Sequence, residues 1–480
     1  MCLVSFLNQS VLACKDGFST AELLLSGKQI SKLLTFLGLM PVAVIHVGHQ
    51  VSIAVPGEYD VGFIGRAFVL EDDQMEEPNF KAALSIEAVN GKYSCSLEVF
   101  LGDVKVWNSG HYSRFYVSDK CVLELTEDGD LRLKGPKNRV GWRTGTSGQG
   151  VERLRILSTG NLVLADALNL IKWQSFNFPT DVILRGQRLN VATRLTSFPT
   201  NSTSYYSLEI EYNKIALYLN SGKWNYSYWE FKPTKNRNIT FIQLSSKGLV
   251  LFNDKNKKIA QIPSRVIQPL RFLALGNKTG NLGLYFYSFI ELKFEATFQA
   301  LNTTCDLPLA CKPYGICTSS NTCSCIRLET KGERINGDCN GGISGGFCGR
   351  GEVEFLELEG VSSVLRDSHK RFNLSKEACG KLCLEDCKCA AALYSTDQKG
   401  CFVYDIVVGL KEVGRGSGKI FMVKVPKGTH GVHGKSSVKK WVLILVGVVD
   451  GLIILAAVAG LGYYFIYKRR KNMLHIGHDN

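Results

Sequence analysis

The chain has 480 residues, of which 45% are hydrophobic and 21% are charged, and its formal net charge is +14. This composition is typical of a globular protein of about three domains, and it excludes a disordered chain and a polytopic membrane protein. The basic residues are scattered, with no long run before residue 435, so we do not expect nucleic-acid binding.

Residues 1–47 are predicted to be a leader with an uncertain start. The apolar stretch Leu33–Val47 follows Lys28 and Lys32, as the core of a signal peptide does. Because many residues precede this stretch, Met40 is an alternative start. The leader therefore indicates export less clearly than the C-terminal features described below.

Residues 48–190 and 200–300 are predicted to be two related β domains. Short stretches that alternate apolar and polar residues surround glycine-bearing turns such as Asp128-Gly129, which favours strands over helices. The stretches "LTEDGDLRL" and "LSTGNLVL" lie about 32 residues apart, and "LSSKGLVLF" repeats the pattern in the second domain. Repeated hairpin units predict a pseudo-symmetric sandwich, barrel or prism.

Most of the 16 cysteines lie close together near the C-terminal end of the predicted globular part. Cys2 and Cys14 fall in the leader, and twelve of the other fourteen lie between residues 305 and 401. Dense cysteines attached to larger, cysteine-poor domains are typical of small secreted modules held by disulfides. No two CxxC pairs and no Cys/His set occur there, so we expect disulfides, no metal site and no cofactor.

Two small modules are predicted from this cysteine-rich part. Residues 301–340 contain too few hydrophobic residues to fold by burial alone, so their disulfides must hold them. Residues 348–425 combine strand-like stretches with an amphipathic helix at 375–388, which predicts a small α+β module.

Asn-x-Ser/Thr sequons support an extracellular location for these domains. A single sequon is weak evidence, but six occur between the predicted leader and the apolar C-terminal stretch. They are Asn201, Asn225, Asn238, Asn277, Asn302 and Asn373.

The C-terminal region predicts a single membrane span. Residues 426–440 form a Gly/Ser/Lys-rich stalk, and Trp441–Tyr467 carries one charge. As a helix this stretch spans about 40 Å, enough to cross a bilayer core. The basic cluster that begins the tail, residues 468–480, favours its cytoplasmic placement. We therefore expect a type I plasma-membrane protein.

Asp450 is the one charge inside this span. It lies between Gly447 and Gly451, whose spacing allows close helix packing. A carboxylate at this depth is costly unless it finds a partner, which predicts self-association or pairing with the span of a receptor kinase. The alternative is that Asp450 reaches the outer interface and the glycines have no such role.

Several stretches resemble one plant family. "VGWRTGT", "STGNLVLAD" and "KWQSFNFPTDVILRGQRL" are similar to bulb-type lectin ectodomains of S-locus glycoproteins and G-type lectin receptor kinases. In that family two β-prism lectin domains precede an EGF-like module and a PAN/apple module, which is the order found over residues 46–425. The resemblance implies a mainly all-β fold: two tandem β-prism domains, an EGF-like module (301–340), an α+β PAN/apple module (348–425) and one transmembrane helix.

The resemblance also implies the disulfide pairing. The EGF-like spacing and the PAN signature give five pairs, and Cys348–Cys387 and Cys95–Cys121 are then left. The five are Cys305–Cys317, Cys311–Cys323, Cys325–Cys339, Cys379–Cys401 and Cys383–Cys389.

The chain departs from the family in two ways. It lacks the kinase motifs, so it resembles kinase-less PAN-domain membrane proteins.

The mannose-binding pattern of the family, Gln-x-Asp-x-Asn-x-Val-x-Tyr, is also incomplete. The residues at the positions of this pattern are candidate sugar contacts of a weakened site. Each replacement removes a hydrogen-bond partner or changes the floor of the pocket. Asp128 survives in one copy, with Thr126, Asp130, Arg132 and Lys134 as replacements; Asn161 and Val163 survive in the other, with Leu157, Thr159 and Ala165 as replacements.

These observations predict a recognition protein rather than an enzyme. The first hypothesis is a membrane glycoprotein that binds a protein, a peptide or a wall glycan and acts with a partner kinase. The second is a lectin whose sugar site lies elsewhere on the prisms. An ectoenzyme is a third hypothesis, because "GISGG" at 342–346 matches G-x-S-x-G, but it lacks the strand–turn–helix context of a nucleophile. His430 and His433 lie in the stalk, where solvated linker residues are the simplest interpretation.

Overall fold

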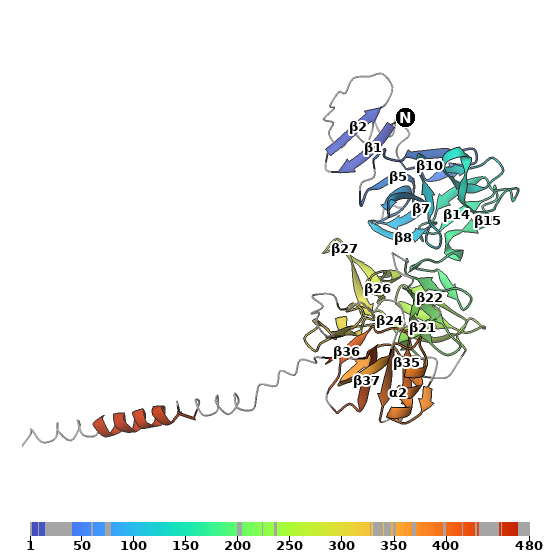
Figure 1. The fold of residues 1–480 in the computed structure, drawn as a ribbon. Helices are drawn as coiled ribbons and strands as arrows, with labels where there is room; N and C mark the ends of the chain where they lie inside the picture. The colour runs from blue at the N-terminus through green and yellow to red at the C-terminus, as the bar shows by residue number, and fades with distance from the viewer. Residues whose placement is uncertain are drawn as a thin grey trace, which may run out of the picture. The chain divides into compact units, whose positions relative to one another are not determined.

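The computed structural model shows a mainly β protein, drawn in Figure 1. It describes residues 2–7, 9–14, 41–58, 61–72, 78–198, 204–222, 224–234, 238–326, 328–329, 339, 347–348, 352–366, 371–396, 400–414, 416–427, 430–431, 451–452 and 454–468. The first strands, β1 (Cys2–Leu7) and β2 (Gln9–Cys14), form a separate antiparallel hairpin.

Residues 44–174 form a first three-sheet unit. The chain first forms the strands β3, β4 and β5, and each of them lies at the edge of a sheet made by a later group of strands. β5 joins β6–β8, β4 joins β10–β12, and β3 joins β13–β15, while β9 pairs with β7. The bounds are β3 (Val44–His46), β4 (Gln50–Ala54), β5 (Ile64–Glu71), β6 (Phe80–Val89), β7 (Lys92–Leu101), β8 (Val104–Asn108), β9 (Phe115–Val117), β10 (Lys120–Leu125), β11 (Leu131–Lys134), β12 (Val140–Arg143), β13 (Arg153–Ile156), β14 (Leu162–Ala165) and β15 (Ile171–Gln174).

The three sheets share one hydrophobic core, to which each contributes a tryptophan. Trp107 of β8, Trp142 of β12 and Trp173 of β15 contact one another edge-to-face, with ring centroids 5.9–6.1 Å apart. Each tryptophan lies in the last strand of its sheet's hairpin group, so the sheets are related by pseudo-threefold symmetry. The predicted repeat of hairpin units is therefore confirmed.

Residues 182–299 form a second three-sheet unit with the same topology. Here β18 joins β19–β21, β17 joins β22–β24, and β16 joins β25–β27. The bounds are β16 (Val182–Leu184), β17 (Arg188–Asn190), β18 (Leu195–Thr196), β19 (Ser204–Ile210), β20 (Ile215–Ser221), β21 (Trp224–Phe231), β22 (Phe241–Ser245), β23 (Gly248–Phe252), β24 (Lys258–Pro263), β25 (Leu270–Leu275), β26 (Leu282–Ser288) and β27 (Lys293–Gln299).

The two units begin earlier than the sequence predicted. β3 pairs with β13, so residues 44–47 of the predicted leader are part of the first unit. β16 and β17 pair with β25 and β22, so these residues belong to the second unit although the prediction assigned them to domain 48–190. Both differences have one cause: these short strands pair with partners that are distant in the sequence.

Two further sheets follow, built from residues that were predicted to form two separate modules. One has the order β29-β28-β36-β32, and the other has the order β31-β37-β34-β35-β33 with helix α2 packed against it. The bounds are β28 (Gly315–Cys317), β29 (Cys323–Cys325), β31 (Val353–Glu359), β32 (Val361–Ser363), β33 (Arg371–Asn373), α2 (Lys376–Glu385), β34 (Ala391–Ser395), β35 (Gly400–Tyr404), β36 (Leu410–Glu412) and β37 (Lys419–Pro426).

The first of these sheets combines strands from residues 301–340 and 348–425. β28 pairs in parallel with β36, and Lys411 of β36 forms a 2.8 Å ion pair with Asp306. Helix α2 begins after Ser375, whose hydroxyl accepts a hydrogen bond from the N–H of Ala378, so the predicted helix is present but shorter than 375–388.

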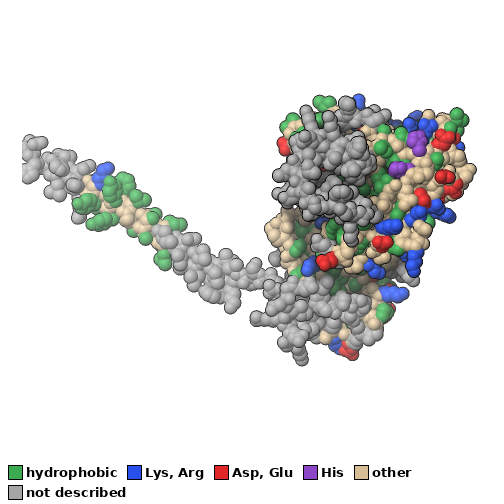
Figure 2. All heavy atoms as spheres, turned by 90° about the horizontal axis from the view of Figure 1, so that it is seen from above, with side chains coloured by type: hydrophobic (Ala, Val, Ile, Leu, Met, Phe, Trp, Pro, Cys, Tyr) green, Lys and Arg blue, Asp and Glu red, His purple; other side chains and the backbone are tan. Residues whose placement is uncertain are grey.

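The remaining described segments are short. β30 (Leu328–Glu329) pairs with β38 (His430–Gly431), and η1 (Pro136–Asn138), η2 (Ser175–Asn177) and η3 (Thr304–Asp306) are 3-10 helices. Residues 451–452 and 454–468 are helical, and Figure 2 shows hydrophobic side chains along them. Over the residues for which coordinates are described, we find no helix of the length and hydropathy needed to cross a membrane. Residues 441–450 and 453 of the predicted span are outside the described residues.

Candidate carbohydrate-binding positions

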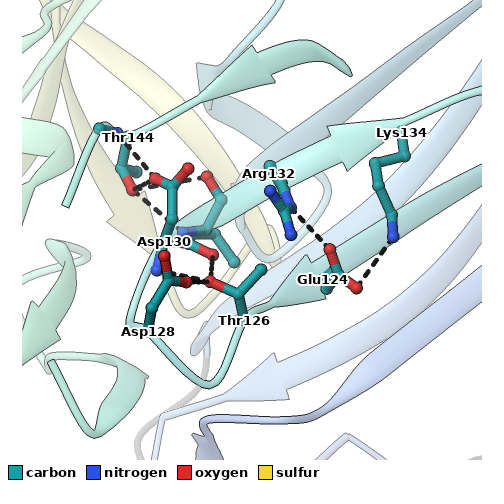
Figure 3. Close-up of polar contacts among 9 residues, drawn as sticks. Glu124, Thr126, Asp128, Asp130, Arg132, Lys134 and Thr144 are labelled. Carbon is teal, nitrogen blue, oxygen red and sulfur yellow. Dashed lines mark hydrogen bonds and ion pairs between the residues drawn. The ribbon is translucent and has the colours of Figure 1, made fainter. Parts of the chain in front are cut away.

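The first copy of the incomplete sugar pattern lies on the hairpin of β10 and β11. The tight turn between them needs glycine at 129, because φ is +88° and a Cβ would lie 2.9 Å from the Cβ of Val151. Figure 3 shows how the side chains on this hairpin lie.

Asp128 is exposed at the turn and is held by its neighbours. It accepts a hydrogen bond from the hydroxyl of Thr126, which itself accepts the N–H of Asp130 at 2.9 Å. The hydrogen bond from Thr126, with a further one from Ser147, lowers the pKa of Asp128. Asp128 therefore stabilises the turn, as Asp commonly does.

Asp130 is buried and faces the following loop. Its Oδ1 accepts hydrogen bonds from the N–H of Gly145 at 2.8 Å, the N–H of Thr146 at 3.2 Å and the hydroxyl of Thr144 at 3.1 Å. Its Oδ2 is also buried and has no hydrogen-bond partner among the described residues. Since neither oxygen is exposed, this side chain does not face a ligand in solution.

Arg132 and Lys134 bind a residue that lies outside the motif. The Nε of Arg132 lies 2.6 Å from one oxygen of Glu124, and the Nζ of Lys134 lies 2.8 Å from the other (Figure 3). Burial acts to raise the pKa of Glu124, but the hydrogen bonds from Lys134 and Arg132 outweigh it and the pKa is lowered. Sequence analysis missed Glu124, although its register opposite Arg132 follows from the strand alternation of the hairpin.

The second copy lies in the turn before β14 and on β14 itself, and it is used in packing. The amide of Asn161 donates to Gln174 Oε1 at 2.7 Å, and its carbonyl oxygen accepts the N–H of Phe176 at 3.2 Å. The Val163 side chain is completely buried. Neither residue is available to a sugar at the surface.

Among the residues that the structure describes there are seven disulfides, and they are the pairs that the resemblance implied. They are Cys95–Cys121, Cys305–Cys317, Cys311–Cys323, Cys325–Cys339, Cys348–Cys387, Cys379–Cys401 and Cys383–Cys389. Within the described part of the chain, no three His, Cys, Asp or Glu side chains are grouped to hold a metal ion.

The sequons differ in their surroundings. Asn238, Asn302 and Asn373 are exposed. Asn277 is also exposed, but its amide donates to Asp181 at 2.9 Å and its oxygen accepts the N–H of Phe198 at 2.7 Å. Asn225 is half-buried, with its side-chain oxygen fully buried.

Some predicted sites lie outside the described residues. These are Asn201, the G-x-S-x-G match at 342–346, His433, Gly447 and Asp450. Gly451 lies at the start of the described C-terminal helix.

Comparison with known proteins agrees with this architecture. The family model for D-mannose binding lectin matches residues 106–204, which include both copies of the sugar pattern. A G-type lectin S-receptor-like serine/threonine-protein kinase of Arabidopsis thaliana is 25% identical over 77% of this chain and 46% of its own length. A PAN domain-containing protein of the same plant is 25% identical over 58% of this chain and 59% of its own length.

A third relative, EP1-like glycoprotein 3 of Arabidopsis thaliana, is 27% identical over 62% of this chain and 73% of its own length. The chain thus spans only about half of the length of the first two relatives, 46% and 59%. The chain is therefore similar to D-mannose binding lectins over residues 106–204, and over longer stretches to a G-type lectin S-receptor-like kinase, a PAN domain-containing protein and an EP1-like glycoprotein.

Proposed function

We propose that this protein is a single-pass plasma-membrane glycoprotein that recognises an extracellular protein, peptide or cell-wall glycan. It acts with a partner protein. Support comes from relatives named as receptor-like kinases and glycoproteins. The apolar C-terminal stretch also supports the proposal, since its described large side chains, such as Leu455 at 66% and Tyr463 at 73%, are mostly exposed.

The observation that carries this proposal is the occupation of the sugar-binding positions by internal partners. A mannose residue at β10–β11 would have to displace Arg132 and Lys134 from Glu124, and Asp130 is already buried. Leaving partly buried charges without partners costs more than an ordinary sugar hydrogen bond returns. Recognition therefore uses another surface or another class of ligand.

A glycan array tests this proposal. The full-length chain, purified in detergent from a plant host, is applied to plant glycans with mannose as competitor. We expect no binding that mannose competes, and Glu124→Gln as a matched variant tests whether freeing Arg132 and Lys134 changes this. Strong mannose-competed binding by the unaltered chain would instead establish a lectin, the alternative function.

The partner is proposed to bind through the membrane span. Gly447 and Gly451 would allow close helix contact, and Asp450 would be the polar group that a partner satisfies. Co-precipitation of membrane partners with the unaltered chain and with Asp450→Leu tests this. Retention of every partner by Asp450→Leu would refute a role for the carboxylate.

A further inference from the structure

Strand β27 is the outer strand of its sheet. One side pairs with β26, and the other side pairs with no strand among the described residues. The N–H of Ala300 donates to the carbonyl of Leu282 at 2.9 Å. Because hydrogen bonds alternate along an antiparallel strand, the N–H and C=O of the preceding Gln299 face the open side. An open edge of this kind is a template for pairing with another chain.

A groove with a volume of about 450 Å³ runs along this open edge. It is lined by residues 296–300, Arg265 and Asn302. The N–H of Arg265 donates to the hydroxyl oxygen of Thr297 at 2.9 Å, which holds the wall of the groove against β27. The volume lies within the range of about 300–1,000 Å³ that accommodates small ligands.

Asn302 at the rim of the groove begins the sequon Asn-Thr-Thr. The preceding Leu301 is buried, and its N–H and C=O bind the Asn281 side chain at 3.0 and 2.8 Å. The backbone that carries Asn302 is therefore fixed, while the Asn302 side chain is exposed. A group attached to Asn302 starts at the groove rather than on a free loop.

The lining suits a carbohydrate. The guanidinium of Arg265 and the amide of Gln299 offer hydrogen bonds to hydroxyl and acetamido groups. Phe298 is half-buried and supplies an apolar wall against which a sugar ring can pack. A few polar groups beside an apolar wall are what a small-molecule site requires.

We propose that an N-linked glycan on Asn302 lies in this groove and covers the open edge of β27. Its first sugars lie beside residues 296–300, where they prevent pairing with another chain. This inference rests on the proposed function, because only a chain that enters the secretory pathway receives such a glycan.

Mass spectrometry and hydrogen exchange test the inference on the full-length chain expressed in plant cells. Thr304→Ala removes the sequon but keeps Asn302, whereas Thr304→Ser keeps the sequon. Asn238→Gln removes another exposed sequon as a matched control. We expect Asn302 to be occupied, and the amides of residues 296–300 to exchange about tenfold faster in Thr304→Ala alone. Exchange in α2 should not change, which verifies that the variant is folded.

The outcomes separate this inference from the proposed function. If Asn238 carries a glycan and Asn302 does not, the inference is overturned and the extracellular placement stands. If no sequon is occupied, the extracellular placement fails as well. If Asn302 is occupied but Thr304→Ala leaves exchange at residues 296–300 unchanged, the glycan does not lie in the groove.

Discussion

His111 connects the loop after β8 to the second three-sheet unit. Its ring is 4% exposed, and Nε2 lies 2.9 Å from the carbonyl oxygen and 3.0 Å from the hydroxyl of Thr196. Burial lowers the pKa of His111 and outweighs the opposite effect of Asp181, while Lys105 lowers it further. The folded protein therefore favours the neutral imidazole.

Acidic pH should weaken this contact between His111 and Thr196. An unfolded histidine has a pKa of about 6.5, so below that pH the unfolded chain binds a proton more readily than the folded chain, and stability falls. We expect the melting temperature to drop more between pH 7 and pH 5 in the unaltered chain than in His111→Gln, which stays neutral. Equal drops in the two proteins, measured by thermal unfolding across pH, would contradict this.

Glu124 should stabilise the β10–β11 hairpin through its two cations. Its lowered pKa means that this contribution exists above the unfolded pKa of about 4.3 and is lost as pH falls through the folded pKa. We expect Glu124→Gln to cost about 1 kcal/mol at pH 7 and progressively less as the pH falls below about 4. Glu127→Gln, an exposed neighbouring change of the same charge, is the control in chemical denaturation. If both variants lose the same stability at pH 7, the ion pairs contribute nothing.

The site residues show what a pattern can and cannot predict. The replacements at Arg132 and Lys134 are visible in the sequence, so a weakened mannose site was predictable. Their partner was missed because Glu124 lies outside the sugar pattern, on the neighbouring strand, although the alternation of the hairpin places it opposite Arg132. The partial burial of Asn225 was likewise not predicted, because a sequon carries no information on packing.

At the scale of elements, Lys424 of β37 stabilises the C-terminal end of α2. It is 1% exposed, and its Nζ donates to the carbonyls of Cys383 at 2.9 Å, Leu384 at 3.3 Å and Asp386 at 3.0 Å. Helices end with carbonyls that lack partners, and a cation there also offsets the helix dipole. Burial lowers the pKa of Lys424, while the Asp386 carboxylate raises it.

Replacing Lys424 should therefore destabilise α2 and its sheet. Lys424→Met keeps the shape of the side chain but leaves these carbonyls without their donor, so we expect a loss of about 2–3 kcal/mol in chemical denaturation. Exposed Lys381 on the same helix provides a control, Lys381→Met, which should change stability little. Comparable losses of stability in both variants would show that the hydrogen bonds from Lys424 to the carbonyls of α2 are not important.

Local hairpins were predictable, but the first strand of each sheet was not. The predicted turn at Asp128-Gly129 joins strands that are neighbours in the sequence, and so does the turn at Gly160. β3 and β16 have only three residues each, and their partners, β13 and β25, lie about a hundred residues away. Three residues carry too little alternation to be recognised, so only the long-range pairing defines them.

At the scale of the molecule, Tyr226 connects the second three-sheet unit to the α2-containing sheet. The Tyr226 hydroxyl donates to the carboxylate of Asp405 and accepts the N–H of Asp405 at 3.0 Å. Nearby, the N–H of Arg366 donates to the carbonyl of Ser227 at 2.6 Å. Burial raises the pKa of Asp405, while the hydrogen bond from Tyr226 lowers it. A single hydroxyl thus satisfies two partly buried groups of the neighbouring segment.

Removing this hydroxyl should uncouple the two parts. Tyr226→Phe fills the same space, but it leaves the N–H and carboxylate of Asp405 without their partner, at a cost of about 1–3 kcal/mol. Calorimetry of the unaltered chain should show the second unit and the α2-containing sheet unfolding together, whereas Tyr226→Phe should separate the transitions. Tyr212→Phe, which removes a hydroxyl from a side chain that is 68% exposed, should behave as the unaltered chain does. If Tyr226→Phe matches Tyr212→Phe, other contacts couple these parts, and the hydroxyl is not needed.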